Sequence, residues 1–262
     1  PKLTPGITNR NVFITGPESY TNYANYTTPA FTDVGGSHNT VVWQPNTRLR
    51  TWEVSGSIDW KLGPDLALKS ITSYQSISGR YGTDFDTTPY GINTNNITNT
   101  HHQFTQELRL NGTSISGLLD WTLGGYYYKA TSYIEGGSII APGAATSSVF
   151  YSDDTIPARS VSGFAHVTAH LTDRLNLTGG IRYTDDKKDY NFRRFNPFNT
   201  SQVSYTAQRL IDGAVGSYSG KRWDYRANID YRLTDDLMVF AQYSTGFRGG
   251  GVGMIEQRQA DH

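Results

Sequence analysis

The sequence predicts an all-β protein, an antiparallel transmembrane β-barrel segment of about eight strands with short periplasmic turns and long extracellular loops. Three observations support this prediction. Apolar and polar residues alternate with a period of two, short and long connections alternate, and aromatic residues occur at two levels along the apolar rows. Successive side chains of a strand point to opposite faces, so a period of two indicates strands with one apolar face.

The clearest strand spans residues 51–62, where apolar or small residues from Trp52 to Leu62 occupy every even position and polar residues every odd one. The next, residues 66–78, is the weakest, because Ile71 falls among the polar positions and Ser70 among the apolar ones. A third spans residues 104–110. Five further rows of the same kind begin at Leu119, Val161, Leu175, Trp223 and Leu237.

The connections between these strands alternate in length. Short turns are predicted at residues 63–65, 111–117, 172–174 and 234–236, and long connections at 1–46, 87–100, 135–157 and 196–218. In an outer-membrane barrel the short turns are periplasmic and the long connections extracellular. We therefore expect one partial barrel domain over residues 1–262. Within it we predict mostly extracellular loop at 1–46, strands and loops at 47–250, and a loop or truncated end at 251–262.

The composition argues against several classes of protein. The 262 residues carry no net charge, which argues against a nucleic-acid partner, because such a surface needs clustered Lys and Arg. No apolar run reaches the roughly 18 residues of a transmembrane helix. A barrel strand needs only every second residue to be apolar, so a polar mean hydropathy is compatible with it. The residues after Pro1 lack the blocks of a signal peptide, and we expect that the chain begins within a longer protein.

The two faces of the strands have different predicted surroundings. Aromatic side chains at both ends of the apolar rows predict a lipid-facing girdle. The girdle residues are Trp60, Tyr74, Trp121, Tyr127, Tyr183, Tyr231 and Tyr243. The opposite face carries charged side chains that would need partners if they were buried away from water. We therefore expect this face to line a water-filled lumen. The predicted lumen-facing residues are Glu107, Arg109, Arg182, Arg226 and Asp230.

Four segments, in order, resemble the TonB-dependent outer-membrane receptors of Gram-negative bacteria. They are FTQELRL at 104–110, LDWTLGGYY at 119–127, the hairpin over 162–187, and the stretch over 230–250. The resemblance implies a barrel of about 22 strands around a plug domain. It also implies active import of a scarce ligand such as a ferric siderophore, with outer-membrane lipid, the plug, TonB and the ligand as partners. No TonB box, plug domain or closing strand with a terminal aromatic is found in the sequence, so we expect an internal portion of such a receptor.

No catalytic site, metal site or cofactor is predicted. His166 and His170 are four residues apart, and on a strand that spacing separates them by roughly 13 Å. Aromatic and basic residues in the long connections could instead contact the imported ligand by stacking or by charge. The predicted ligand-contacting residues are Tyr90, Tyr151, Arg193, Arg194, Phe195, Phe198 and Tyr205.

Two other classes of protein remain open from the sequence. A passive porin or other small barrel is the first, since eight strands can close on themselves. It requires the first and last strands to pair. The second is a secreted soluble sandwich or propeller that binds carbohydrate, which requires Trp60 and Trp121 to lie in a dry core. Neither alternative is an enzyme.

Overall fold

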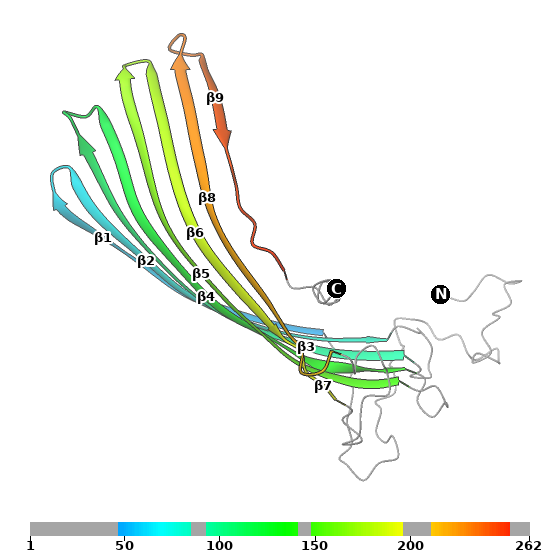
Figure 1. Ribbon diagram of the computed structural model, residues 1–262. Helices are drawn as coiled ribbons and strands as arrows, with labels where there is room; N and C mark the ends of the chain where they lie inside the picture. The colour runs from blue at the N-terminus through cyan, green and yellow to red at the C-terminus, as the bar shows by residue number, and fades with distance from the viewer. Residues whose placement is uncertain (1–46, 85–92, 141–147, 196–210, 252–262) are drawn as a thin grey trace, which may run out of the picture.

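The computed structural model describes residues 47–84, 93–140, 148–195 and 211–251, and these form one curved, antiparallel sheet (Figure 1). The strands follow one another in sheet order, except that β7 pairs with β5 and β8 lies beside β6. Their bounds are β1 Thr47–Gly63, β2 Leu66–Asp84, β3 Asn93–Ser114, β4 Leu119–Ile140, β5 Ser148–Thr172, β6 Leu175–Asn191, β7 Arg194–Phe195, β8 Val215–Arg232 and β9 Met238–Ser244. We call the end that carries the four hairpin turns the short-turn end, and the opposite end the long-connection end.

The register of the sheet is almost unbroken. β3 and β4 stay paired from Asn93 opposite Ile140 to Ser114 opposite Leu119 without a shift. The two register shifts among the described strands lie beside hairpin turns, at Lys61/Gly63 and at His170/Thr172. Because side chains alternate between faces, an unbroken register keeps each set of residues on one face along the whole strand.

The prediction of about eight strands is confirmed by eight long strands, to which the structure adds the two-residue β7. The weak segment 66–78 lies within β2, paired on both sides. Its out-of-phase Ile71 is opposite Glu107 on the polar face. Ser70 and Thr72, on the apolar face, both contact the Gln106 side chain, at 3.0 and 2.5 Å. Local hydrogen bonds thus satisfy the polar groups that made this strand hard to recognise.

The predicted bounds of three long connections, 87–100, 135–157 and 196–218, were wrong. Residues 93–100, 135–140 and 148–157 were assigned to loops but belong to β3, β4 and β5, and β8 begins at Val215. The predicted turn at 111–117 also starts too early, because β3 runs to Ser114 and the chain reverses through residues 115–117, all with positive φ. These strand ends are rich in Thr, Asn, Ser and Gly on both faces, so they have no apolar alternation to detect.

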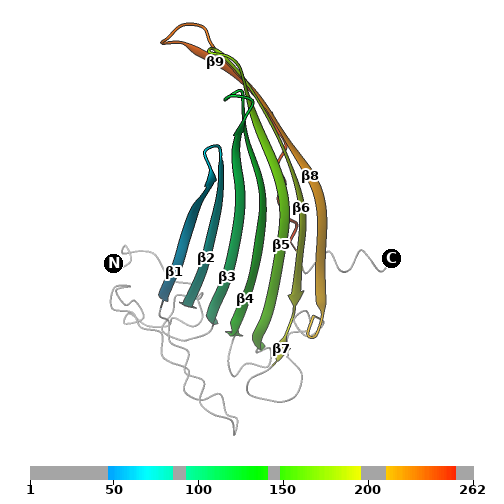
Figure 2. The same ribbon diagram turned by 90° about the vertical axis from the view of Figure 1, so that its left-hand side faces the viewer.

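The described residues form a single layer, as Figure 2 shows from the side. Within them, only Ala130 and Phe192 are buried hydrophobic residues, whereas large apolar side chains such as Ile58 (68%) and Val54 (65%) are exposed. Trp60 is 64% exposed, contrary to the dry core that a sandwich requires. In the described part of the chain no helix has the length and apolar character to cross a membrane.

Candidate functional site: the two faces of the wall and its long-connection end

The cross-strand pairs place all seven predicted girdle residues on one face. Trp60 lies opposite Leu68, which lies opposite Leu110, and the same row continues through Leu123 to Ala165. Directly paired residues share a face, so the row defines one apolar face. The register connects the other girdle residues to this face: Tyr74, Trp121, Tyr127, Tyr183, Tyr231 and Tyr243. Their contact with lipid stays a prediction.

Two further rings on this face, His102 and Tyr133, were not identified from the sequence. Trp52 lies 5.3 Å from Tyr74, centroid to centroid, and His102 lies 6.4 Å from both Tyr74 and Tyr133. These four rings form a line across β1, β2, β3 and β4, which we call the aromatic line. A count of residues from each short turn could have found it, because its members lie at comparable distances from the turns.

All five predicted lumen-facing residues lie on the opposite, polar face. Glu107 accepts a hydrogen bond from Arg109 Nε at 2.5 Å, and the Arg182 guanidinium carbon is 5.8 Å from the Tyr126 and Phe164 ring centres. The remaining two, Arg226 and Asp230, are on the same face of β8. Cation–π contacts of this length are attractive even at exposed sites.

The polar face is the more crowded of the two. Ala130, Ser162 and Thr184 all lie on it and are exposed by only 3, 4 and 7%. Crowding is expected on the concave side of a curved sheet, where side chains converge, and the exposed apolar rows then occupy the convex side. The sheet therefore has the curvature of a barrel wall with a polar interior.

Near the short-turn end, polar side chains form a chain across the concave face. Thr113 donates to Asp120 at 2.8 Å, and Asp120 contacts His170 Nε2 at 2.9 Å. The other ring nitrogen of His170 lies 2.8 Å from Asn176 Oδ1, and Asn176 donates to Asp230 at 2.6 Å. The chain thus connects β3, β4, β5, β6 and β8. We call it the cross-strand network.

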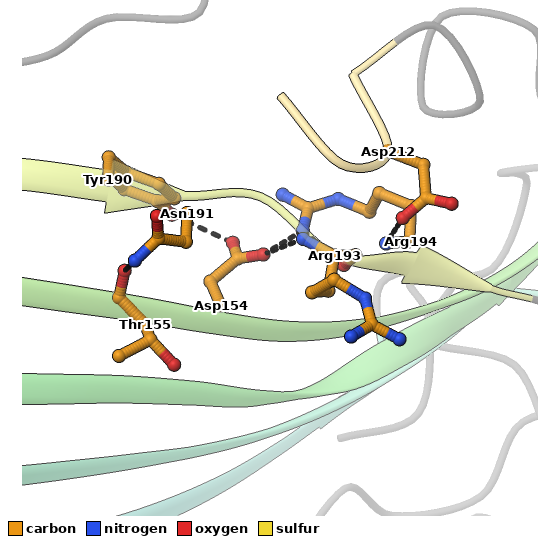
Figure 3. A network of polar contacts seen from close by, with 7 residues as sticks. All are labelled: Asp154, Thr155, Tyr190, Asn191, Arg193, Arg194 and Asp212. Carbon is orange, nitrogen blue, oxygen red and sulfur yellow. Dashed lines mark hydrogen bonds and ion pairs between the residues drawn. The ribbon is translucent and has the colours of Figure 1, made fainter. Parts of the chain in front are cut away.

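At the long-connection end, Asp154 is the centre of a second polar cluster, which we call the Asp154 cluster (Figure 3). The carboxylate is 1% exposed and accepts hydrogen bonds from the Tyr190 hydroxyl at 2.8 Å and from the Arg193 backbone N–H at 3.0 Å. It also forms an ion pair with Arg194. The Arg194 backbone N–H donates to Asp212 at 2.7 Å, so the cluster ties β5 and β6 to the segment before β8.

Aromatic rings cover this cluster. Phe192 is 2% exposed and stacks on Tyr190 with a 4.0 Å centroid separation, and the Arg194 guanidinium lies 5.7 Å from the Phe192 ring centre. Burial and the hydrogen bond to Asp154 raise the pKa of Tyr190 to about 12. The hydroxyl is therefore a proton donor to Asp154 throughout the physiological range.

The structure brings four of the predicted ligand-contacting residues together here. Tyr151 and Phe195 lie opposite each other with ring centres 5.0 Å apart, beside Arg193 and Arg194. Arg193 and Phe195 are exposed, whereas the Arg194 side chain is 6% exposed and is held by Asp154. The other three, Tyr90, Phe198 and Tyr205, lie outside the described residues. Ligand contact by any of the seven stays a prediction.

Comparison with known proteins agrees with this architecture. The sequence model of the TonB-dependent receptor-like β-barrel family matches residues 3–257. The chain belongs to the TonB-dependent receptor family. It is 25% identical over 210 residues to the pesticin receptors of Yersinia enterocolitica and Yersinia pestis, covering 73% of this chain and 28% of those receptors. It thus spans less than a third of the length of these relatives.

Solved structures of the family share the fold. The ferric yersiniabactin uptake receptor FyuA of Yersinia pestis aligns with a TM-score of 0.61 at 20% identity, over 82% of this chain and 31% of that receptor. The ferric-catecholate import receptor Fiu of E. coli K12 aligns with a TM-score of 0.56 at 14% identity, over 79% and 37%. The family is one of receptors, and both structures are of β-barrels of this kind.

Proposed function

We propose that this chain forms part of the wall of a bacterial outer-membrane transporter, which imports a scarce iron chelate with energy transmitted by TonB. The observation that carries the proposal is the contrast between the two faces of one continuous sheet. The convex face is apolar with aromatic rings at two levels, and the concave face is charged and hydrogen-bonded. Lipid on one side and a wet lumen on the other account for both faces.

Physical arguments support a membrane on the convex side. A contiguous apolar patch of more than a few hundred Å² is rare on a soluble monomer, and here exposed apolar rows run across the strands in the short-turn half of this face. A strand crosses the bilayer with about 9–11 residues. β4 has 22 residues, so roughly half of it extends beyond the hydrocarbon. The surplus lies at the long-connection end, where we propose that the ligand is received.

We propose a ferric siderophore as the ligand class. The names of the two structural relatives describe uptake of ferric yersiniabactin and import of ferric catecholates, and chelates of this kind are aromatic and often anionic. At the long-connection end, Tyr151 and Phe195 offer rings for stacking and the exposed Arg193 offers a positive charge. Tyr90, Phe198 and Tyr205 are proposed to join them. Arg194 would act by holding this segment in place.

The concave face is proposed to contact the plug domain of the whole receptor. The charged residues Glu107, Arg109, Arg182, Arg226 and Asp230 would face the plug and the water around it, and the plug would pass the TonB-dependent force on. Buried charges without partners are costly, whereas a polar plug and water can satisfy them.

The passive-barrel alternative requires β1 to pair with β9, and within the described strands these two form the opposite edges of the sheet.

The proposal is tested in the complete gene product. We expect cells that express it to accumulate labelled iron from a matching siderophore, and to lose this uptake when TonB is absent. Deletion of residues 196–210, which leaves β8 and Asp212 in place, should weaken siderophore binding while the barrel remains folded in detergent. Uptake that persists without TonB would support a passive barrel. Binding that is unchanged by the deletion would remove the ligand role of that connection.

A further inference from the structure

Basic residues lie on the apolar face, both among its outer aromatic rings and beyond them. Lys129, Arg159 and Lys187 occupy one pairing row, with Lys129 directly opposite Arg159 and Arg159 directly opposite Lys187. All three side chains are exposed. They lie on three central strands, β4, β5 and β6, so their juxtaposition does not depend on what adjoins the edges of this sheet.

Like charges directly opposite each other destabilise a sheet. The acids nearest to this row on the same face are Asp185 and Asp189 of β6, and Asp185 already lies 3.8 Å from Lys221. Within the described part of the chain, no carboxylate lies within ion-pair distance of the three cations of the row. The row therefore has an excess of positive charge that an anion from outside the chain would relieve.

A second basic group occurs at the same end of the sheet. Arg48 lies directly opposite Arg80, and Arg50 lies two residues further along β1. With the hydroxyl residues Ser78 and Thr98 these arginines line a shallow hollow of about 290 Å³. Guanidinium groups and hydroxyls are the donors that bind phosphate oxygens best.

The row that contains Arg80 also carries acids on this face. Arg80 is opposite Thr98, and the row continues through Glu135 to Asp153. The described residues place none of these carboxylates within ion-pair distance of Arg80. The hollow itself is lined only by basic and hydroxyl residues.

Both groups lie at the level of the aromatic rings or beyond it. Lys129 is in the pairing row of Phe104 and Tyr74 and lies nearer the short turns than Tyr133. Moving away from the short turns, Arg50 comes two residues beyond Trp52, Lys129 two beyond Tyr127, and Lys221 two beyond Trp223. Lys187 comes four residues beyond Tyr183. Aromatic side chains of membrane proteins sit at the level of the headgroups, so cations one step further out lie where lipid phosphates lie.

We propose that these residues form a lipid-phosphate site on the outside of the wall. The outer basic belt, as we call it, comprises Arg48, Arg50, Arg80, Lys129, Arg159, Lys187 and Lys221. Its ligand is the phosphorylated headgroup of a lipid in the outer leaflet of the membrane, held by charge and by hydrogen bonds at the level of the aromatic line and beyond it. This inference rests on the proposed function, because it requires the convex face to contact lipid.

The test uses the complete protein inserted into phosphatidylcholine nanodiscs that contain either bisphosphorylated lipid A or its dephosphorylated form. Bound lipid A is measured after extraction, or by native mass spectrometry. The variant Lys129→Gln/Arg159→Gln/Lys187→Gln removes the central row. Its matched control, Lys69→Gln/Lys188→Gln/Arg222→Gln, removes the same charge from the concave face. Each cation near a headgroup layer adds about 1 kcal/mol to binding of anionic lipid.

We expect the wild type to retain bisphosphorylated lipid A in preference to the dephosphorylated form, and the convex-face variant to lose roughly tenfold to a hundredfold in this preference. The concave-face control should keep it, and Lys129→Arg/Lys187→Arg should keep it too. Equal retention of both lipids, or equal losses in the two triple variants, would overturn the inference.

Quenching of tryptophan fluorescence by brominated acyl chains, measured in the same nanodiscs, separates this inference from the proposed function. Quenching without a phosphate preference would mean that the wall contacts lipid and that only the outer basic belt is wrong. Absence of quenching would overturn both, because a face that does not contact acyl chains cannot hold lipid phosphates beside them.

Discussion

The two ends of the sheet are built differently, although the same strands run through both. Toward the short turns each strand has one apolar and one polar face, and the apolar side chains are exposed. Toward the long connections polar residues occur on both faces, and buried groups appear, with Asp154 and Phe192 exposed by 1 and 2%. The short-turn half relies on its surroundings for stability, whereas the long-connection half makes its own buried contacts.

This difference between the two ends shows which structural property the alternation of apolar and polar residues indicates. Alternation indicates that one face of a strand meets an apolar medium, and it does not indicate the strand itself. Residues 93–100 are paired on both sides in β3 and show no alternation, because both of their faces meet polar surroundings. Four experiments test whether the two ends of the sheet are stabilised in different ways.

The largest effect is expected from Asp154→Ala. This change removes Asp154 from among the partners of the buried Arg194 guanidinium, and breaking a buried ion pair costs about 3–5 kcal/mol. Hydrogen exchange of the complete protein should show faster exchange around residues 151–154 and 190–195, with the short-turn half unchanged. The control is Asp153→Ala, on the exposed neighbour, which should have little effect. Similar exchange in the two variants would show that Asp154 does not brace this end.

A charge on the convex face should affect the other half. Ile181→Lys places an ammonium about midway along the apolar rows, where we expect a loss of about 2–4 kcal/mol in a bilayer. Thr178→Lys, three residues away on the concave face, should cost far less because its ammonium meets water. Denaturant unfolding from lipid vesicles, followed by tryptophan fluorescence, measures both. Equal losses for the two variants would contradict the assignment of the faces.

Tyr190→Phe removes one donor from the Asp154 cluster and should cost about 1 kcal/mol. It should also remove a pH dependence. The folded-state pKa of about 12 lies above the ordinary tyrosine value of 10.0, so the stabilisation by Tyr190 is present below pH 10 and is lost as the pH rises toward 12. Hydrogen exchange is too fast to follow at such pH, so limited proteolysis of residues 190–195 is the measurement. A wild type as sensitive as the variant below pH 10 would refute the contribution of this hydroxyl.

The smallest effect is expected from the cross-strand network. The side chains of His170 and Asp120 are 40 and 55% exposed, and exposed ion pairs contribute little to stability because water screens them. A double-mutant cycle with His170→Ala and Asp120→Ala in the vesicle-unfolding assay should therefore give a coupling close to zero. A much larger coupling would mean that the cross-strand network stabilises the short-turn half in the way that Asp154 stabilises the long-connection half.

The residues explain which parts of the molecule could be predicted. The alternation in 51–62 and in 219–233 placed Trp60 and Tyr231 on one face and Arg226 and Asp230 on the other, and the register agrees. The extension of β4 to Ile140 and the start of β5 at Ser148 could not be predicted, because hydroxyl and amide side chains suit both loops and wet strands.

The Asp154 cluster and the outer basic belt could not be found from the sequence for a different reason. Asp154 meets Tyr190 and Arg194 across 36 and 40 residues of chain, and Arg159 faces Lys187 only because of the register. Nothing local to Asp154 or Arg194 marks them as partners, and the sequence predicts contact with the ligand for Arg194. Contacts between distant residues depend on strand pairing, which alternation alone does not fix.

The unbroken register restricts how this wall can evolve. Loss of one residue in the middle of β4 would turn every later side chain of that strand to the opposite face, so that Tyr133 would leave the convex face and Ser132 the concave one. Insertions and deletions are therefore tolerable only in the connections, at the turn-adjacent shifts, or in matched pairs on neighbouring strands. Specificity for new ligands can then diverge by changes of loop length, while the strands change only by substitution at constant length.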